Sequence, residues 1–572
     1  MRNGEIADAF EELASLYELD GVVVYRVLAY RNAAKAIREA GVSVEELARQ
    51  GRVGELPGVG KTIAEKIDAL LETGSIPATE KLKARIPAGL VAITRIPGLG
   101  PKRARQLYDT LGISTPDELR VAAEQGRLKD VPGFGAKAEE NVLAALAGGA
   151  DGRPKARVLL SKALAVAEEL VAGLREHPSA IEVELAGSAR RMVDAVKDLD
   201  IVVASSDPAA LVEHFCSLEA VDVVSTSGAA GAKVLTHSGL AVDLRIVPAD
   251  AFGNLLQHFT GSGRHNEALR NAAVRRGLHV SEYGIADDES GDSIAFAMEE
   301  EVYERLGMQW IPPELREDRG ELEAARAGTL PKLIELDDIR GDLHMHTTLS
   351  DGHASAEEMA RTARERGYDY VAITDHSASH GFGNDVQPDE LLRSAEHVRS
   401  IEIPGMTVLA GTETNVLPDG SLDYADDVLE QLDWVVASLH TSFRIPEEEQ
   451  TERMLRAMEH PLVDAIGHPT GRLIERRSAY AIDLDRVIAK AVETGTFLEI
   501  NANPDRRDLN DIYAKAASEA GAMLVIDSDA HWPRTLANMR YGVATARRAW
   551  LTADKVANTR PWAELDRLRK RA

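Results

Sequence analysis

Apolar runs of strand length alternate with helical patterns from residue 340 to the end of the chain. Helical patterns cover 355–367 and 483–495. A chain that alternates in this way between strands and helices is typical of parallel βα units. We therefore predict a βα barrel, with strands at 370–374, 406–410, 434–438, 464–467 and 523–526.

The residues before 340 contain two differently patterned regions. Residues 1–150 show almost no strand-like alternation and predict short helices joined by glycine turns. After a polar break near residue 150, strand patterns at 181–188, 199–205 and 240–248 predict a sheet, and helix returns at 252–280. The chain is expected to combine a helical N-terminal part, an α+β middle part and a C-terminal α/β barrel.

Composition places the chain among multidomain globular proteins. Its 572 residues are enough for three or more domains, and 44% of them are apolar. Cys216 is the single cysteine, which excludes an intrachain disulfide. No apolar run approaches the roughly 18 residues of a membrane helix, and Met1 is followed by polar sequence that does not resemble a signal peptide. We expect a cytoplasmic protein without membrane contact.

Net charge does not exclude a nucleic-acid partner. The formal net charge is −27, but residues 1–150 carry 20 Lys and Arg against 21 Asp and Glu. Phosphate contacts require only local basic surface or free backbone N–H groups. The nearly neutral N-terminal region can therefore bind DNA although the chain as a whole is acidic.

One glycine-rich element occurs three times in the N-terminal region. The segments 56–67, 96–107 and 131–142 share an apolar residue, Pro-Gly, a second apolar residue and Gly, followed by a helical sequence. The glycines allow a tight turn, and the helix start presents unpaired N–H groups to a phosphate. One copy is equally typical of a plain helix–helix turn, but three copies favour helix-hairpin-helix DNA binding. The glycines are Gly58, Gly60, Gly98, Gly100, Gly133 and Gly135.

Three aspartates of the middle region have the spacing of a two-metal site. Asp198 and Asp200 are two residues apart on a predicted strand, so their side chains project from the same face. Asp243, on another strand, can complete a cage for two Mg²⁺ or Mn²⁺ ions that promote phosphoryl transfer. A bare Asp-x-Asp is more often a solvated strand end. Upstream residues favour the metal site because they can donate hydrogen bonds and charge to a triphosphate: Gly187, Ser188, and Arg190 or Arg191.

Nine histidines and acidic residues accompany the predicted barrel strands. Each lies in or just after an apolar run, and is expected at the carboxyl end of a strand, where barrel enzymes carry their active sites. Mixed histidine and carboxylate ligands suit Zn²⁺ or Mn²⁺ better than Mg²⁺, and such a site can hydrolyse phosphoesters. Arg444, Arg472 and the segment 501–508 are candidates for the rim of this site. The nine are His344, His346, Asp351, His376, Glu413, His440, His468, Asp529 and His531.

Several motifs of the middle region belong together. They are GS-x-RR at 187–191, DLD at 198–200, VDLR at 242–245, HFTGSGRHNEALR at 258–270 and SEYGI at 281–285. This set resembles the palm and nucleotide-binding region of family X DNA polymerases, the group of DNA polymerase beta. The resemblance implies that Asp198, Asp200 and Asp243 bind the catalytic metals, with Asp243 nearest the primer 3′-hydroxyl. It also implies contacts with the triphosphate for Ser188 and Arg191, with the sugar and base for Gly261 and Asn266, and with the template for Arg270.

The N-terminal segments AYRNAAKAI (29–37) and LPGVGKTIAEKIDALLETG (56–74) resemble the small lyase domain of the same polymerases. The resemblance places Lys66 at the position of the lyase nucleophile, which forms a Schiff base with an opened abasic sugar. A solvated or phosphate-contacting lysine is the alternative.

Two positions of the polymerase-like region depart from the family pattern. Lys197 replaces a glycine before DLD, and His258 replaces a tyrosine before FTGS. Neither departure removes a metal ligand.

The order of the nine ligand candidates resembles that of the PHP domain, named for polymerase and histidinol phosphatase, over residues 340 to about 550. The resemblance implies a distorted seven-stranded βα barrel that binds up to three metal ions. His380, His397 and His460 lie outside the ligand pattern and are expected to be ordinary surface or core histidines.

Together the resemblances predict six regions and two activities. The expected protein is a monomeric repair polymerase that binds gapped or nicked DNA and deoxynucleoside triphosphates and carries a PHP 3′–5′ exonuclease or abasic-site endonuclease. Two alternatives are a PHP phosphoesterase whose polymerase-like region only tethers it to DNA, and a scaffold for DNA ends. The six regions are a lyase-like helix-hairpin-helix domain (1–80), a fingers-like domain with two further hairpins (81–150), a palm (151–250), a nucleotide-selecting subdomain (251–320), a linker (321–339) and a PHP domain (340–572).

Overall fold

The computed structural model divides the chain into two compact units. One unit comprises residues 1–158, 162–185 and 197–249, and the other comprises 159–161, 186–196 and 250–572. No helix within the described residues is long and apolar enough to cross a membrane. The structure describes residues 1–22, 24–40, 42–94, 96, 99–132, 134–135, 139, 142–143, 157–381 and 383–570.

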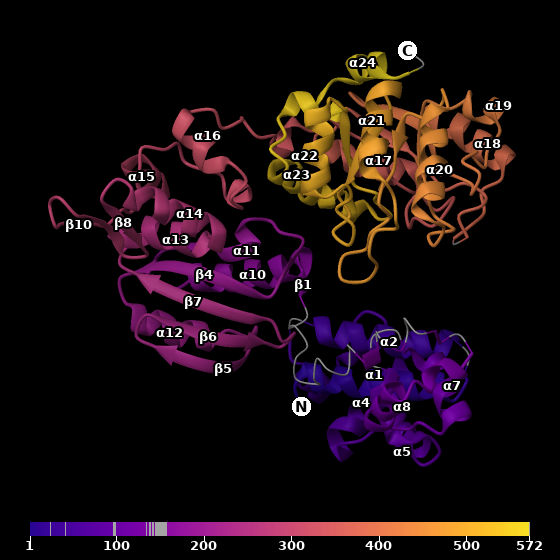
Figure 1. The fold of residues 1–572 in the computed structure, drawn as a ribbon, viewed down its shortest axis with the longest axis horizontal. Coiled ribbons are helices and arrows are strands. Elements are labelled where there is room, and N and C mark those ends of the chain that lie inside the picture. The colour runs from indigo at the N-terminus through magenta and orange to yellow at the C-terminus, as the bar shows by residue number, and fades with distance from the viewer. Residues whose placement is uncertain are drawn as a thin grey trace. The chain divides into compact units, whose positions relative to one another are not determined.

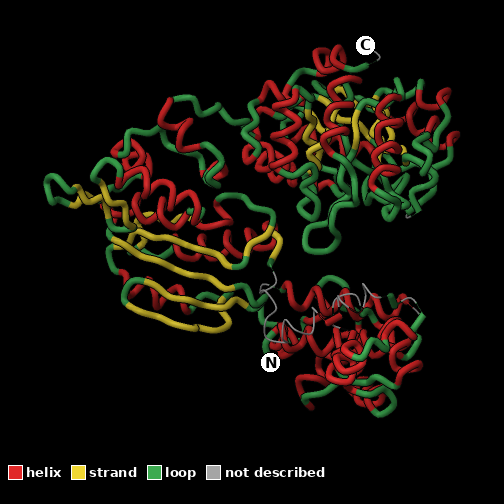
Figure 2. The backbone as a smooth tube through the Cα atoms, viewed as in Figure 1, coloured by secondary structure: helices red, strands yellow, loops and turns green. Residues whose placement is uncertain are grey.

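Short helices form the N-terminal region, as the sequence pattern predicts (Figure 2). Their ends follow capping chemistry, since the Ser43 hydroxyl accepts a hydrogen bond from the Glu46 N–H and Gly74 ends its helix in the left-handed conformation. Their apolar faces share one core that includes Phe10 and Ile67. The helices are α1 (Asn3–Leu19), α2 (Val24–Glu39), α3 (Val44–Arg49), α4 (Lys61–Thr73), α5 (Pro77–Lys83), α6 (Ala88–Thr94), α7 (Pro101–Leu111) and α8 (Pro116–Glu124).

The same unit contains a five-stranded sheet in the order β2-β4-β7-β6-β5. The central pair β4 and β7 is parallel, whereas the other neighbours are antiparallel. The register of this central pair places Asp200 directly opposite Asp243. The strands are β2 (Ala180–Leu185), β4 (Asp198–Ser205), β5 (Val221–Gly228), β6 (Gly231–Thr236) and β7 (Ala241–Val247), and α12 (Pro208–Cys216) packs on β5 and β6.

The second unit begins with a small α+β region. Its core contains Val302 and Tyr303 and extends into the segment 321–339, where Leu322 and Leu333 are buried in the same cluster. That segment, which the sequence suggests as a linker, therefore contributes core side chains and includes a helix. The elements are α13 (Phe252–Thr260), α14 (Gly263–Val274), β8 (Leu278–Ser281), β9 (Gly284–Asp287), β10 (Ser293–Ile294), α15 (Glu299–Arg305) and α16 (Glu321–Ala327).

A buried ion cluster holds the short helix α11 (Gly187–Arg190) against this region. The two oxygens of Glu299 accept hydrogen bonds from Arg190 at 2.9 and 3.1 Å, and Arg316 donates to Oε1 at 2.5 Å. Trp310 Nε1 donates to Oε2 at 2.8 Å. Burial alone would raise the pKa of Glu299, but the two guanidinium groups lower it to about 2. The carboxylate is therefore ionised at neutral pH.

The C-terminal region is a nearly closed barrel of seven parallel strands, with helices around them (Figures 1 and 2). The strands follow the order of the sequence, and an isolated parallel bridge between Met345 and Ala530 connects the two edges. The predicted seven-stranded βα barrel is confirmed. Its strands are β11 (Gly341–Asp342), β12 (Tyr370–Ile373), β13 (Thr407–Asn415), β14 (Trp434–Ser438), β15 (Ala465–Ile466), β16 (Phe497–Asn501) and β17 (Leu524–Asp527), and its helices include α17 (Ala356–Glu365), α18 (Pro388–Arg399), α20 (Glu447–Glu459), α21 (Leu484–Thr494), α22 (Asp511–Ala520) and α23 (Met539–Arg548).

Side chains of the barrel strands alternate between the interior and the helical layer. Tyr370 lies in an inner cluster with Trp434 and Phe497, whereas Val371 and Ile373 pack in the outer core with the helices. These inner residues stand near the start of their strands. The amino-terminal end of the barrel is thus filled with apolar side chains, which leaves the carboxyl-terminal end for polar groups.

We predict that Glu299→Gln lowers the free energy of unfolding of the second unit by about 3 kcal/mol at pH 7, as expected from a pKa that is lowered from 4.5 to about 2. Because the pKa of Glu299 is lower in the folded protein than in the unfolded chain, its carboxylate stabilises the fold fully at a pH above the unfolded-state pKa of 4.5. This stabilisation is lost as the pH falls through the folded-state pKa of about 2. Urea unfolding at pH 7 and pH 3 measures the difference between the variant and the unsubstituted protein, which should shrink at the lower pH. Glu300→Gln, at the exposed next position of the same helix, is the matched control. An equal loss in both variants would contradict the role of the ion cluster.

Candidate functional site

The alternation of the barrel strands carries the ligand candidates into the interior. His376 lies an even number of residues after the inward-facing Tyr370, and Glu413 and Asp529 have the same relation to Leu409 and Val525. Since every second side chain of a strand faces the same way, these polar side chains continue the inner face beyond its apolar part. They therefore meet at the carboxyl-terminal end of the barrel, as the sequence predicts.

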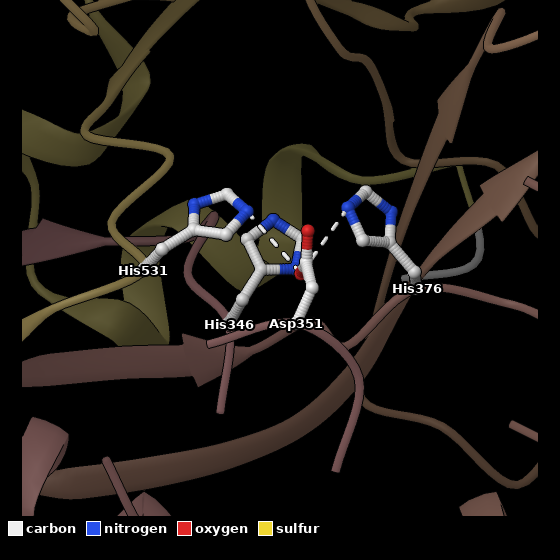
Figure 3. Close-up of side chains that lie close together, drawn as sticks. All are labelled: His346, Asp351, His376 and His531. Carbon is white, nitrogen blue, oxygen red and sulfur yellow. Dashed lines mark ion pairs between the residues drawn. The ribbon is translucent and has the colours of Figure 1, made fainter. Parts of the chain in front are cut away.

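Eight of the nine candidates form three overlapping groups, and in each group the ligand atoms lie within 4.8 Å of one another. Asp351 Oδ1 is 3.6 Å from His376 Nε2 and 3.3 Å from His531 Nε2, and these side chains point toward one another (Figure 3). His346 and His376 each belong to two groups, so the groups share ligands. The groups are His346, Asp351, His376 and His531; His344, His346 and Asp529; and His376, Glu413 and His440.

The ninth candidate, His468, contacts the same cluster through Glu413. Its Nε2 lies 2.9 Å from Glu413 Oε1, and His344 Nε2 lies 3.3 Å from Oε2 of the same carboxylate. Burial alone would raise the pKa of Glu413, but the surrounding imidazoles, His440 and His344 first, hold it well below its ordinary value. Glu413 is therefore an ionised carboxylate at the centre of a histidine shell.

The chemistry of this donor set fits a metal centre. Within the described part of the chain, both ring nitrogens of His346, Nε2 of His344 and Oε2 of Glu413 are buried without a hydrogen-bond partner. Buried polar atoms of this kind are costly unless a ligand satisfies them. Burial lowers the pKa of His346 to about 3 and that of His468 to about 4, so these two imidazoles are neutral and offer lone pairs. Against the effect of burial, neighbouring carboxylates raise the pKa of His344 and raise that of His531 to about 9, so these two would release a proton on binding a metal. Neutral imidazoles beside ionised carboxylates are the form in which such residues bind metals.

Two ligand candidates have strained backbones. His468 has φ of 30° and Asp529 has φ of 52°, a region that costs a residue with a side chain about 1–3 kcal/mol and that is concentrated at functional sites. The residue before His468 is Gly467, where an added Cβ would lie 2.3 Å from Ser438 Oγ and 3.4 Å from His344 Cε1. Since an added Cβ would also lie 2.8 Å from Val436 Cγ1, glycine at this position leaves room for the side chains of Ser438 and Val436 on the neighbouring strand β14.

The structure reveals one supporting residue that the sequence analysis missed, Glu499, and one that it named only as part of the segment 501–508, Asn501. Glu499 Oε1 lies 2.6 Å from His344 Nδ1, and Asn501 donates hydrogen bonds to Glu499 at 3.1 Å and to Asp529 at 3.0 Å. Both residues share the inward face of β16 with Phe497. A carboxylate on the second nitrogen of a ligating histidine fixes the orientation of its ring. The even spacing of these polar residues from Phe497 was the signal that could have identified them.

Of the two arginines expected at the mouth of the barrel, one differs from the sequence-based expectation. Arg472 is ion-paired with Asp194 at 2.8 Å and donates to the Arg507 carbonyl, so it serves a structural contact. Arg444 is exposed. Arg506, in the segment 501–508, lies instead beside the ligand candidate Asp529, with Nε 3.6 Å from Oδ2. Arg506 therefore brings a positive charge to the ligand cluster.

The neighbouring Arg507 connects the barrel to the loop that follows α11. Its buried guanidinium donates to the Met192 carbonyl at 2.9 Å, is 3.3 Å from Asp194 Oδ1 and donates to Thr545 at 2.9 Å. Arg548 extends this connection by donating to the Arg191 carbonyl at 2.8 Å. Two arginines of the barrel thus hold the backbone of residues 191 and 192.

The predicted palm carboxylates share one face of the five-stranded sheet. Asp198 and Asp200 are two residues apart on β4, so their side chains project from the same face, and Asp243 is the register partner of Asp200. Asp243 is ion-paired with Lys233 at 2.9 Å and with Arg245 at 3.1 Å. Unlike the barrel groups, these three carboxylates do not all lie within 4.8 Å of one another in the described structure. An oxygen-only donor set facing one side nevertheless suits Mg²⁺, and its role as a metal site stays a prediction.

The predicted nucleotide-binding residues of the second unit are held by polar contacts. Arg191 donates to the Thr260 carbonyl at 2.6 Å and to Glu317 at 3.1 Å, and Gly261, at φ of 69°, lies against the same guanidinium. Asn266 donates to the His258 carbonyl at 2.7 Å. Gly187 also has a positive φ, of 62°. Arg190 pairs with Glu299 and is not free for a phosphate, while Ser188 is half-buried and Arg270 exposed. The proposed roles of these residues stay predictions.

The described part of the glycine repeats has the geometry that phosphate binding requires. Gly60 and Gly100 stand at the N-caps of α4 and α7, and in the described structure no side chain caps either helix start. Gly58 has φ of 76°, as a tight turn requires. Lys66, the predicted lyase nucleophile, is half-buried with its ammonium 5.9 Å from the ring centre of Tyr30. Gly135 is described, but Gly98 and Gly133 lie outside the described residues.

Four family models match separate regions of the chain. Models of a helix-hairpin-helix domain and a SAM-like helix-hairpin-helix tandem match residues 1–76 and 90–147. Models of the DNA polymerase beta thumb and of the PHP domain match 255–317 and 342–503. The matched PHP region contains seven of the nine barrel ligand candidates, because only Asp529 and His531 lie beyond it.

Curated relatives fall into two classes. A probable phosphatase of Thermoanaerobacter sp. (strain X514) is 33% identical over 238 residues, which are 38% of this chain and 89% of that protein. A probable phosphatase of Shewanella sediminis is 31% identical over 242 residues, 40% of this chain and 94% of that protein. The DNA polymerase/3′–5′ exonuclease PolX of Bacillus subtilis is 38% identical over 575 residues and covers both chains completely. The chain therefore belongs to the PolX family, the family X DNA polymerases that carry a C-terminal PHP domain.

Proposed function

We propose that this protein fills short gaps in DNA by templated nucleotidyl transfer and removes nucleotides from 3′ ends with its PHP domain. The observation that carries the proposal is the similarity to a DNA polymerase/3′–5′ exonuclease over the full length of both chains. The buried histidine and carboxylate groups supply a hydrolytic site, and the carboxylates of β4 and β7 supply a transfer site. Gapped or nicked DNA and deoxynucleoside triphosphates are the proposed substrates.

At the transfer site, Asp198, Asp200 and Asp243 would hold Mg²⁺ or Mn²⁺. Such ions stabilise the attacking and leaving oxygens of an in-line displacement. Lys233 and Arg245, which pair with Asp243, have exposed side chains and can move aside when a cation binds. Asp243 would lie nearest the primer 3′-hydroxyl, and Ser188 with Arg191 would hold the triphosphate.

At the hydrolytic site, the nine barrel ligands would hold up to three Zn²⁺ or Mn²⁺ ions. A bound ion polarises the phosphate and lowers the pKa of bound water towards about 7. Glu499 orients the ring of His344, and Arg506 beside Asp529 provides a positive charge for the phosphate. The same site would suit incision at abasic sites.

In the N-terminal region, the uncapped starts of α4 and α7 would hold the DNA backbone through their N–H groups without reading its sequence. Gly58, Gly60, Gly98, Gly100, Gly133 and Gly135 would form the three turns. Lys66 as a lyase nucleophile, a monomeric state and a cytoplasmic location remain predictions. The two alternatives are a phosphoesterase tethered to DNA and a scaffold for DNA ends. Each of the three functions predicts a different effect of the same substitutions on activity.

Two single substitutions separate the activities. Asp200→Ala should lower templated incorporation on gapped DNA by about 100-fold or more and leave 3′ degradation unchanged, because only the transfer site loses a ligand. His344→Ala should abolish degradation and leave incorporation unchanged. Both are measured on end-labelled gapped DNA with Mg²⁺, Mn²⁺ and Zn²⁺, and each variant is the control for the other. Unchanged incorporation by Asp200→Ala would support the tethered phosphoesterase, and a protein without either activity would support the scaffold.

A third substitution tests the support of His344. Glu499→Gln should weaken Mn²⁺ binding or exonuclease activity about 10- to 100-fold, because outer carboxylates that orient a metal-binding histidine have effects of this size. Calorimetric Mn²⁺ titration and the degradation rate at saturating metal provide the two readouts. Glu493→Gln, which alters an exposed partner of Lys490, is the matched control. Equal metal affinity in both variants would exclude this role for Glu499.

A further inference from the structure

In the described structure, a single edge of the metal-ligand cluster is open to solvent. The side chains of His531 and Asp351 are 28% and 22% exposed, whereas those of the other seven ligand candidates are at most 5% exposed. A phosphodiester that reaches the cluster must therefore approach past His531 and Asp351.

A stacked surface group lies at this edge. Trp532 follows His531 directly, and its ring stacks on that of His353 with centroids 4.0 Å apart and planes inclined by 24°. The guanidinium of Arg534 lies 4.2 Å from the centre of the Trp532 ring. We call His353, Trp532 and Arg534 the stacking group. All three are exposed, with 36% of Trp532 accessible.

The backbone fixes the stacking group relative to the ligands. His353 donates its N–H to the His531 carbonyl at 2.8 Å, which joins the loop of Asp351 to the loop of His531. The Trp532 N–H donates to Thr535 Oγ1 at 3.2 Å, and the Thr535 hydroxyl donates back to the Trp532 carbonyl at 2.8 Å. The backbone of Trp532 is therefore fixed beside the ligand edge, and its exposed indole is held there by stacking on His353.

We propose that the stacking group binds the base and phosphate of the nucleotide at the 3′ end of single-stranded DNA, an inference that rests on the proposed exonuclease function. Every base has a π-face, so an exposed indole binds bases without selecting a sequence. The base would take the place that Arg534 occupies on the indole, and the released guanidinium would pair with a backbone phosphate. The group thus favours DNA ends over phosphoesters without a base.

The test compares two DNA ends, one with a normal 3′ nucleotide and one with a 3′ tetrahydrofuran residue that lacks a base. Trp532→Ala should raise KM for the normal end about 5- to 150-fold, the range of base–aromatic stacking, with little change in kcat. KM for the abasic end should stay within about 2-fold. Trp532→Tyr, which keeps an aromatic ring, should keep most of the preference in KM for the normal end over the abasic end. Arg534→Gln should raise KM for both ends and reduce the dependence of KM on salt concentration.

Tyr513→Ala is the matched control, because Tyr513 is 37% exposed on α22 and does not belong to the ligand loops. Metal content and gap filling, measured on each variant, report on its folding, and His353→Leu replaces Trp532→Ala if the latter loses metal. Equal effects of Trp532→Ala on KM for the two ends would overturn the stacking proposal while the exonuclease function stands. An unsubstituted protein that degrades neither end with any metal would overturn both.

Discussion

Closure of a seven-stranded parallel sheet forces alternate side chains of every strand into one small enclosed volume. In this barrel, aromatic and aliphatic side chains such as Trp434, Phe497 and Tyr370 fill the volume at the amino-terminal end. At the carboxyl-terminal end the same alternation continues with histidines and carboxylates, most of which are buried. Because buried polar atoms must be satisfied, the shared ligands and the oriented His344 both follow from this one requirement.

The sequence predicted the barrel and its ligands well because both have local signatures. Apolar runs of strand length are recognisable without knowledge of the fold, and the polar residue that ends each run marks the carboxyl end of the strand. Three ligands, His376, Glu413 and Asp529, lie at even spacings from inward-facing residues, so their convergence follows from alternation alone. The predicted strands at 370–374 and 434–438 agree with β12 and β14 within one residue.

The rest depends on contacts between residues that are distant in the sequence. Glu499 stands in a strand that carries no ligand motif, and its role becomes visible only when β16 is placed beside the ring of His344. Arg190 looked available for a triphosphate, but Glu299, more than a hundred residues later, neutralises it. Arg472 looked like a phosphate ligand and is instead the partner of Asp194. No local pattern identifies which of several arginines will find a buried carboxylate.

The attachment of Arg507 to the Met192 carbonyl limits how the two activities can be dissected. The segment that contributes Arg506 and Asn501 to the hydrolytic site also supports, through its next residue, the loop behind Gly187 and Ser188. A deletion or replacement of residues 501–508 would therefore disturb the support of the loop next to Ser188 and Arg191, the residues proposed to hold the triphosphate, as well as the proposed hydrolytic site. Clean separation-of-function alleles have to be single substitutions at inward-facing ligands, and truncations of the barrel mouth cannot serve as exonuclease-deficient controls.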